Sequence, residues 1–150
     1  MKELNSVFKI VIVHDDLISA IQAVEMLKRL AERLESEHGI GCNIWQTINN
    51  IWKFDWLEDP ELWEQVVANT IEADMIIISA GSSTELPACV RNWIEKALPR
   101  KQGEPTALVA LIGGERKNRS ESSQSGVFLR QMAQQFGFDF FCNLDHQPAL

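Results

Sequence analysis

The sequence predicts a single α/β domain in which helices flank a parallel β-sheet. Short, β-branched apolar segments typical of buried strands alternate along the 150 residues with segments whose apolar residues recur at helical spacing. Five such strand–helix steps favour a three-layer arrangement with right-handed crossovers and helices on both faces of the sheet. The length is close to the common size of one domain, so we expect residues 1–150 to share one core.

The N-terminal part predicts a buried strand and a long helix. Residues 8–13 form a β-branched run that ends at a polar segment. Asp16 belongs to the residue types preferred as N-caps, so we expect the helix to begin there and to stop at Gly39. The apolar residues at helical spacing, expected on its inward face, are Leu17, Ile21, Val24, Leu27, Ala31 and Leu34.

The next elements are an edge strand, a helix and the most apolar strand of the chain. Residues 42–48 are less apolar than the other predicted strands, which suits a sheet edge, and an aromatic connection at residues 52–56 follows them. Asp59 and Pro60 supply an N-cap and a first-turn proline, so a helix is expected to begin there. Residues 74–80 should form the central strand.

The C-terminal half repeats the alternation. Residues 106–112 predict a strand, and a polar loop at residues 115–125 leads into a helix with Gly137 at its C-terminal cap. The apolar residues of that helix are Val127, Leu129, Met132, Ala133 and Phe136. Residues 138–144 predict the last strand. An earlier helix begins near Pro87, and its expected inward residues are Leu86, Val90, Trp93, Ile94 and Ala97.

A sheet of five parallel strands in this class has the expected order 2-1-3-4-5, with ligands at the carboxyl ends of the strands near the switch point between the first and third strands. Polar and glycine residues follow the first, third and fourth predicted strands. The candidate ligand-binding residues are Asp15, Ser79, Gly81, Ser82, Ser83, Thr84, Gly113, Gly114, Arg116 and Arg119.

Residues 73–98 resemble a known family. The strand Ala73–Ser79 is followed by a short polar loop and by a helix in which Pro87, Arg91 and Asn92 keep a characteristic spacing. This segment is similar to the strand, loop and helix of NADPH-dependent FMN reductases and related flavodoxin-like quinone reductases. The resemblance implies a flavodoxin-like fold in which the loop after the third strand touches the flavin ring.

The sequence departs from that family at the flavin site. The family holds the FMN phosphate in a Ser/Thr-rich loop after the first strand, where this chain has His14-Asp15-Asp16-Leu17. Ser82-Ser83-Thr84 stand where the family has an aromatic–Asn pair, so the loop offers no stacking partner for flavin. We expect a non-catalytic ligand-binding or interaction module without a cofactor. The alternative is an FMN-dependent NAD(P)H oxidoreductase with a divergent flavin site.

Other chemistry-bearing residues have structural interpretations. The Asp15-Asp16 pair resembles the acidic pair with which response-regulator receivers hold Mg²⁺, but Ser79 stands at the place of the phosphoacceptor aspartate. We therefore expect a helix cap and a solvated loop there. His14 and His146 are expected to be independent surface histidines, Cys89 a structural cysteine, and no metal is expected.

Composition limits the partners. The net charge of −7 disfavours nucleic acid and anionic membranes, and no apolar segment approaches the roughly 20 residues of a spanning helix. Three scattered cysteines and no secretory pattern indicate a cytoplasmic protein. The basic, hydroxyl-rich loop at residues 115–125 favours a small anionic ligand. A homodimer is expected, with its aromatic interface drawn from Trp45, Trp52, Trp56 and Trp63.

Overall fold

The structure, a computed structural model, describes residues 9–38, 51–80, 86–101, 106–112 and 124–142. The strands are β1 (Ile10–His14), β2 (Ile51–Lys53), β3 (Met75–Ala80), β4 (Ala107–Ile112) and β5 (Asp139–Cys142). The α-helices are α1 (Leu17–His38), α3 (Pro60–Glu72), α4 (Ala88–Ala97) and α5 (Gln124–Phe136), and two short 3₁₀ helices are η2 (Phe54–Glu58) and η3 (Leu98–Lys101).

The five strands form one parallel sheet in the order β2-β1-β3-β4-β5. This order confirms the predicted 2-1-3-4-5 topology and the flavodoxin-like fold class. β1 lies between β2 and β3, and its last residue, His14, pairs in register with Lys53 on one side and Ser79 on the other. The carboxyl ends of these three strands therefore meet at one edge of the sheet, which we call the carboxyl edge.

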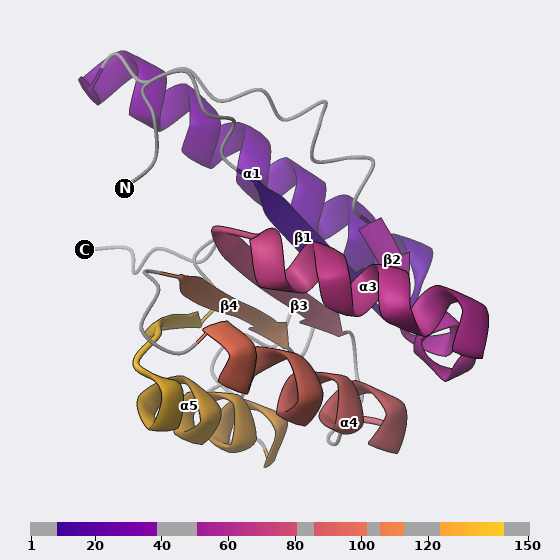
Figure 1. Ribbon diagram of the computed structural model, residues 1–150. Coiled ribbons are helices and arrows are strands. Elements are labelled where there is room, and N and C mark those ends of the chain that lie inside the picture. Colours follow the sequence, from indigo (N-terminus) through magenta and orange to yellow (C-terminus); the bar gives the residue numbers. More distant parts are fainter. Residues whose placement is uncertain (1–8, 39–50, 81–85, 102–105, 113–123, 143–150) are drawn as a thin grey trace.

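Helices cover both faces of the sheet (Figure 1), and a hydrophobic layer lies between the sheet and the helices on each face. Alternate strand residues such as Val11 and Ile76 pack with α3, α4 and α5 on one face, and Ile10 and Ile77 pack with α1 on the other. The alternation follows from the two-residue period of a strand, in which successive side chains point to opposite faces. β1 and β3 are buried on both faces and therefore carry apolar residues toward both layers. In the described part of the chain no helix is long and apolar enough to cross a membrane.

Local sequence explains where several helices begin and end. Asp59 caps α3 by accepting a hydrogen bond from the backbone N–H of Glu61, and Pro60 opens that helix without losing an intrahelical bond. Gly137 follows α5 with a φ of +80°, a conformation that strains residues with a Cβ atom. The predicted inward face of α4 is confirmed, since Val90, Trp93 and Ile94 are fully buried.

The predicted inward face of α1 is right only in part. Leu27 is buried and Val24 is half-buried, but Leu17 and Ile21 are 72% and 47% exposed, and the buried face is rotated by one position toward Ala20 and Ala23. The buried apolar residues on that face are Ala20, Ala23, Met26 and Leu27. Small alanines let the helix backbone approach the sheet closely, which decides the helix rotation here against the larger side chains. Of the apolar residues predicted on α5, Val127 is also exposed, whereas Leu129, Met132 and Ala133 are buried.

The edge strand also differs from the prediction. β2 covers Ile51–Lys53, within the segment predicted to be an aromatic connection, and pairs with β1. The strand predicted at residues 42–48 lies outside the described residues. Trp52 is the central residue of β2 and is buried, and its ring meets Trp56 edge-on with the ring centres 6.0 Å apart. Trp52 therefore extends the sheet and is buried together with Phe54, whereas Trp56 is exposed.

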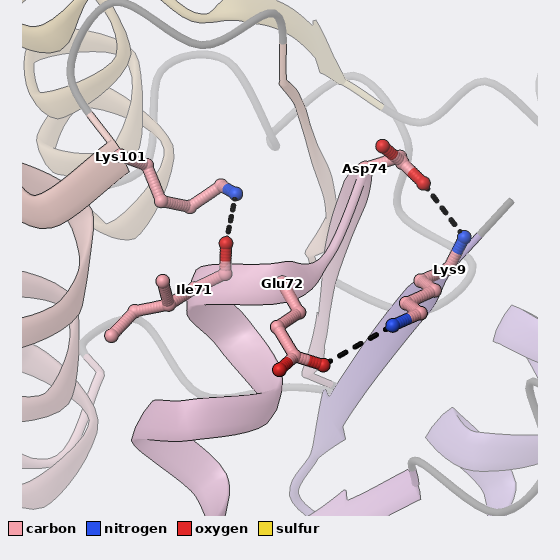
Figure 2. Close-up of polar contacts among 5 residues, drawn as sticks. All are labelled: Lys9, Ile71, Glu72, Asp74 and Lys101. Carbon is pink, nitrogen blue, oxygen red and sulfur yellow. Dashed lines mark hydrogen bonds and ion pairs between the residues drawn. The ribbon is translucent and has the colours of Figure 1, made fainter. Parts of the chain in front are cut away.

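Polar contacts join the elements at the opposite, amino edge of the sheet (Figure 2). The backbone N–H of Lys9 donates to the carboxylate of Asp74 over 2.8 Å, and the Lys9 ammonium pairs with Glu72 over 3.2 Å. The buried Lys101 donates from Nζ to the carbonyl of Ile71 over 2.7 Å. These contacts tie the start of β1 and the end of α4–η3 to the last turn of α3.

Candidate functional site

Three side chains lie in one row at the carboxyl edge, where this fold class binds its ligands. His14, Lys53 and Ser79 are register partners on β1, β2 and β3. The N-terminus of α1 begins directly beyond them, because Asp15 and Asp16 alone separate β1 from the helix. The short connection places the helix N-terminus close to the switch point between β1 and β3.

His14 is buried, so the prediction that it is a surface histidine is wrong. Its Nδ1 lies 2.8 Å from the backbone carbonyl oxygen of Asp16. A carbonyl only accepts, so Nδ1 carries the proton and Nε2 is the unprotonated nitrogen of the neutral ring. Burial lowers the pKa of His14 below its usual 6.5 and outweighs the raising effects of the Asp16 carbonyl and the Asp15 and Asp16 charges. The ring is thus neutral at physiological pH.

Asp16 caps α1, as predicted. Its Oδ1 accepts a hydrogen bond from the backbone N–H of Ser19 over 2.9 Å. This bond from the Ser19 amide is the main reason that the pKa of Asp16 lies below its usual value. The N-terminus of α1 therefore already holds an ionised carboxylate of the chain itself, at the kind of position where a helix binds an external anion.

Ser79 links β3 to α1. Its side chain is fully buried, and its hydroxyl donates to the backbone carbonyl of Ser19 over 2.9 Å. The Ser79 carbonyl in turn accepts from the backbone N–H of Asp15 over 3.2 Å. The hydroxyl proton is therefore used to seat the first turn of α1 on the sheet.

Of the ten predicted ligand-binding residues, the structure describes two, and it brings them together. Asp15 and Ser79 are joined through the backbone hydrogen bond at the carboxyl edge, where Asp15 is partly exposed. The other eight, Gly81, Ser82, Ser83, Thr84, Gly113, Gly114, Arg116 and Arg119, lie outside the described residues. His146 lies outside them as well.

Sequence reasoning missed the exposed apolar side chains of α1 at this edge and anticipated Trp56 alone, as an interface residue. Leu17, Ile18 and Ile21 lie on the first two turns of α1, and Trp56 lies in η2 just after β2. We call these four residues the edge surface. Single exposed apolar residues are ordinary. These four large side chains lie in the segments that follow β1 and β2 at the same edge, with α1 packed on one face of the sheet and η2 packed against α3 and α4 on the other. The sequence did contain a sign of these exposed residues, because α1 carries two apolar stripes and only one of them can face the sheet.

Acidic residues accompany the edge surface. Asp16 precedes α1, and Asp55, Glu58 and Asp59 lie in or next to η2, all of them exposed. Lys53 is the nearest described cation in sequence, with its Nζ 4.0 Å from a carboxylate oxygen of Asp55. The region is thus apolar with an acidic border, which disfavours anionic ligands and favours partners with basic groups.

Cys89 has a structural role. Its Sγ lies 3.5 Å from the Phe54 carbonyl and donates to it, which ties the start of α4 to η2. Burial, with the nearby charge of Glu58, raises the pKa of the thiol, the opposite of what a nucleophile requires. Within the residues that the structure describes, no group of three or more His, Cys, Asp or Glu side chains is arranged to hold a metal ion.

The two helix residues that carry the resemblance to FMN reductases are both exposed on α4. The guanidinium carbon of Arg91 lies 5.5 Å from the centre of the Phe128 ring of α5. Such a cation–π contact holds Arg91 against the neighbouring helix. Asn92 is exposed, and Pro87 precedes α4 in an extended conformation as its N-cap residue.

No family model and no curated protein matches this chain. Solved structures similar to it include an azoreductase from Bacillus anthracis, with 14% identity, a TM-score of 0.44, and coverage of 89% of this chain and 84% of that one. Another is a putative quinone reductase from Klebsiella pneumoniae, with 11% identity, a TM-score of 0.40, and coverage of 95% and 78%. The likeness extends to the fold alone.

Proposed function

We propose that this chain is a flavodoxin-like binding module that does not hold FMN and that meets its partner or ligand at the carboxyl edge of the sheet. The observation that carries the proposal is the Asp16 carboxylate on the Ser19 amide. This negatively charged carboxylate occupies the N-terminus of α1, the position at which an FMN phosphate would bind.

Charge repulsion and the cap of α1 both oppose a phosphate at the start of this helix. Two unit charges 4 Å apart repel by about 1 kcal/mol in water and by about 4 kcal/mol at the effective dielectric near a protein surface. A phosphate dianion at the start of α1 would lie beside Asp16, whose pKa is lowered, and close to Asp15 in sequence. It would also have to displace the cap bond to Ser19. Each effect opposes flavin binding through its phosphate.

The edge surface supports an interaction role. Leu17, Ile18, Ile21 and Trp56 offer an apolar contact area, and the exposed carboxylates around them favour a partner with basic groups at its border. Trp is among the residues that most often dominate the binding free energy of protein interfaces. A single exposed indole at a sheet edge therefore supplies the anchor for such a contact.

A second copy of the chain is one partner that we propose for this surface. Of the four tryptophans predicted for a homodimer interface, Trp52 is buried, Trp63 is half-buried and Trp45 lies outside the described residues. Trp56, which is 44% exposed, is left as the anchor. Sedimentation equilibrium at micromolar concentration should show a dimer that Trp56→Ala dissociates, whereas a monomer of 17.0 kDa would exclude self-association.

The alternative function is an FMN-dependent NAD(P)H oxidoreductase with a divergent flavin site. The observation that favours it is the resemblance of residues 73–98 together with the confirmed fold class. Such an enzyme would have to hold the phosphate away from the start of α1, for example at the Ser-rich segment before α5. The two functions differ in whether the purified chain binds FMN.

Titration of FMN fluorescence with the protein separates them, with riboflavin as the ligand that lacks the phosphate. We expect no quenching of FMN at micromolar protein. Asp16→Asn keeps a good N-cap and removes the charge, so any gain in FMN affinity should appear in this variant. Asp55→Asn is the matched control, because it removes an exposed carboxylate of η2 and leaves the start of α1 intact. Micromolar FMN binding by the unmodified chain would overturn the proposal.

A further inference from the structure

A groove runs along the outer side of α3 and α4, on the face of the sheet opposite α1. Its volume is about 450 Å³, within the range of roughly 300–1,000 Å³ typical of small-molecule sites. Its walls come from α3 on one side and from the end of α4 and η3 on the other. None of the residues that line it belongs to the edge surface.

The α3 wall of the groove is apolar. Trp63, Val67 and Ile71 follow one another at intervals of four residues and therefore form one stripe along the helix. The stripe is about 12 Å long, from eight residues at 1.5 Å each. Val67 is buried, whereas Trp63 and Ile71 are half-buried. Part of the Trp63 and Ile71 side chains is therefore open to solvent in the groove. A flat or extended apolar body of that length fits such a wall.

The opposite wall is cationic. Lys96 in the last turn of α4 and Arg100 in η3 are four residues apart, both line the groove, and both are exposed. In the described ranges neither forms an ion pair within 4.0 Å. Two cations that line one groove without an ion-pair partner among the described residues, in a chain with a net charge of −7, favour an anion there. Glu64 of α3 also lines the groove, and it opposes an anionic ligand.

Hydrogen bonds from buried side chains join the two walls of the groove and fix their relative position. Trp93 of α4 donates from Nε1 to the hydroxyl of Thr70 over 3.0 Å, and that hydroxyl donates to the Val66 carbonyl over 2.7 Å. Lys101 of η3, which directly follows Arg100, donates to the carbonyl of Ile71 (Figure 2). Helices fixed in this way lose little conformational freedom when a ligand binds, so the site is pre-organised.

From this geometry we propose that the groove between α3 and α4 binds a small amphipathic anion, an aromatic or extended apolar body carrying one carboxylate or sulfonate. The apolar body lies along Trp63, Val67 and Ile71, and the anionic group meets Lys96 and Arg100. This site is separate from the carboxyl edge, and it does not depend on the function proposed there.

Anilinonaphthalene sulfonate is a suitable probe because it combines an aromatic body with one anion, and phenylnaphthylamine is its neutral analogue. We expect saturable binding of the sulfonate at one site per chain. Arg100→Gln should weaken the sulfonate about three- to tenfold, the effect of losing about 0.7–1.4 kcal/mol from one exposed charge contact. The same variant should leave the neutral analogue unchanged, and Glu64→Gln should strengthen sulfonate binding alone.

Trp63→Ala tests the apolar wall, and we expect it to weaken both probes. Leu17→Ser is the matched control, since it removes an exposed apolar side chain from the edge surface, which is the other apolar area on which the probe could bind. The proposal is overturned if no saturable binding occurs, if Arg100→Gln weakens both probes equally, or if Leu17→Ser abolishes binding and Trp63→Ala does not. Because the Arg100 side chain is exposed, we expect Arg100→Gln to keep the fold, and an unchanged circular dichroism spectrum verifies this.

Discussion

The hydrogen bond between Trp93 and Thr70 gives the sharpest stability test of the packing between α3 and α4. Both side chains are fully buried, and the indole N–H donates to the Thr70 hydroxyl over 3.0 Å. Thr70→Val keeps the volume and branching of the side chain but removes the acceptor. The Val66 carbonyl also loses the Thr70 hydroxyl as a donor. It stays paired, because in a regular helix it still accepts the backbone N–H of residue 70.

The expected loss comes from the orphaned indole. A buried donor without a partner costs about 1–3 kcal/mol, so the free energy of unfolding should fall by that amount. In a domain of this size, each kcal/mol lowers Tm by about 2–4 °C. Urea unfolding followed by far-UV circular dichroism measures the change. The loosened contact should also weaken sulfonate binding in the groove if the two walls are held by this bond.

A double-mutant cycle isolates the bond from the rest of the packing. Trp93→Phe removes the indole N–H and leaves a cavity, and in that background Thr70→Val no longer orphans a donor. The second substitution should therefore be nearly neutral when it is made in the Trp93→Phe variant. A loss from Thr70→Val below about 0.5 kcal/mol in the parent chain, or an equal loss in both backgrounds, would refute the reasoning.

Four further expectations concern single residues. Gly137→Ala should lower stability by about 1 kcal/mol in urea unfolding, because φ is +80° while a Cβ would meet nothing within 4 Å; a neutral effect would contradict this. NMR titration should give His14 a pKa below 6.5. The unfolded chain takes up this proton at a higher pH than the folded chain, so the contribution of His14 to stability is fully present above pH 6.5 and is lost as pH falls through the folded pKa. His14→Phe should flatten this dependence of the free energy of unfolding on pH. Asp16→Ala should cost about 1 kcal/mol through the lost cap, a contribution present above pH 3.8 and lost as pH falls through the lower folded pKa. Cys89 should react with a disulfide reagent at pH 8 more slowly than free cysteine, and an equal rate would show that its pKa is not raised.

The order of the sheet was predictable because the strand signals are strong. β1 and β3 are runs of Ile and Val that are buried on both faces, and only parallel strands covered by helices need such continuous apolarity. Pro87 and Asp59–Pro60 marked the starts of α4 and α3 within a residue. Once five strands alternate with helices, few topologies remain.

The rotation of α1 and the position of β2 were not predictable from local pattern. α1 carries two apolar stripes, one with Leu17 and Ile21 and one with Ala20 and Ala23. Hydropathy favours the larger residues, but the close approach of the helix to β1 and β3 favours the alanines. β2 consists of three residues, Ile51–Lys53, too few for an alternating pattern to stand out from an aromatic segment.

The place of the candidate site at the carboxyl edge follows from the topology, whereas the surroundings of its side chains were predictable only in part. The carboxyl edge followed from the topology, and the role of Asp16 followed from its position before a helix. The burial of His14 depends on its register partners Lys53 and Ser79, which lie 39 and 65 residues away along the chain. No local signal reports such a neighbourhood, and the same holds for the groove, where Trp63 and Arg100 meet only through the packing of α3 against α4.

The two proposed surfaces differ in charge, and this difference makes their independence testable. The edge surface is bordered by exposed carboxylates, whereas the groove carries Lys96 and Arg100. A basic partner is therefore favoured at one and an anion at the other, and salt should weaken both contacts by screening. Since the surfaces share no residue, substitutions in the two should act additively on stability and on binding, within about 0.5 kcal/mol. A larger coupling between Trp56→Ala and Arg100→Gln would mean that α3, which begins just after η2 and forms one wall of the groove, transmits occupancy from one surface to the other.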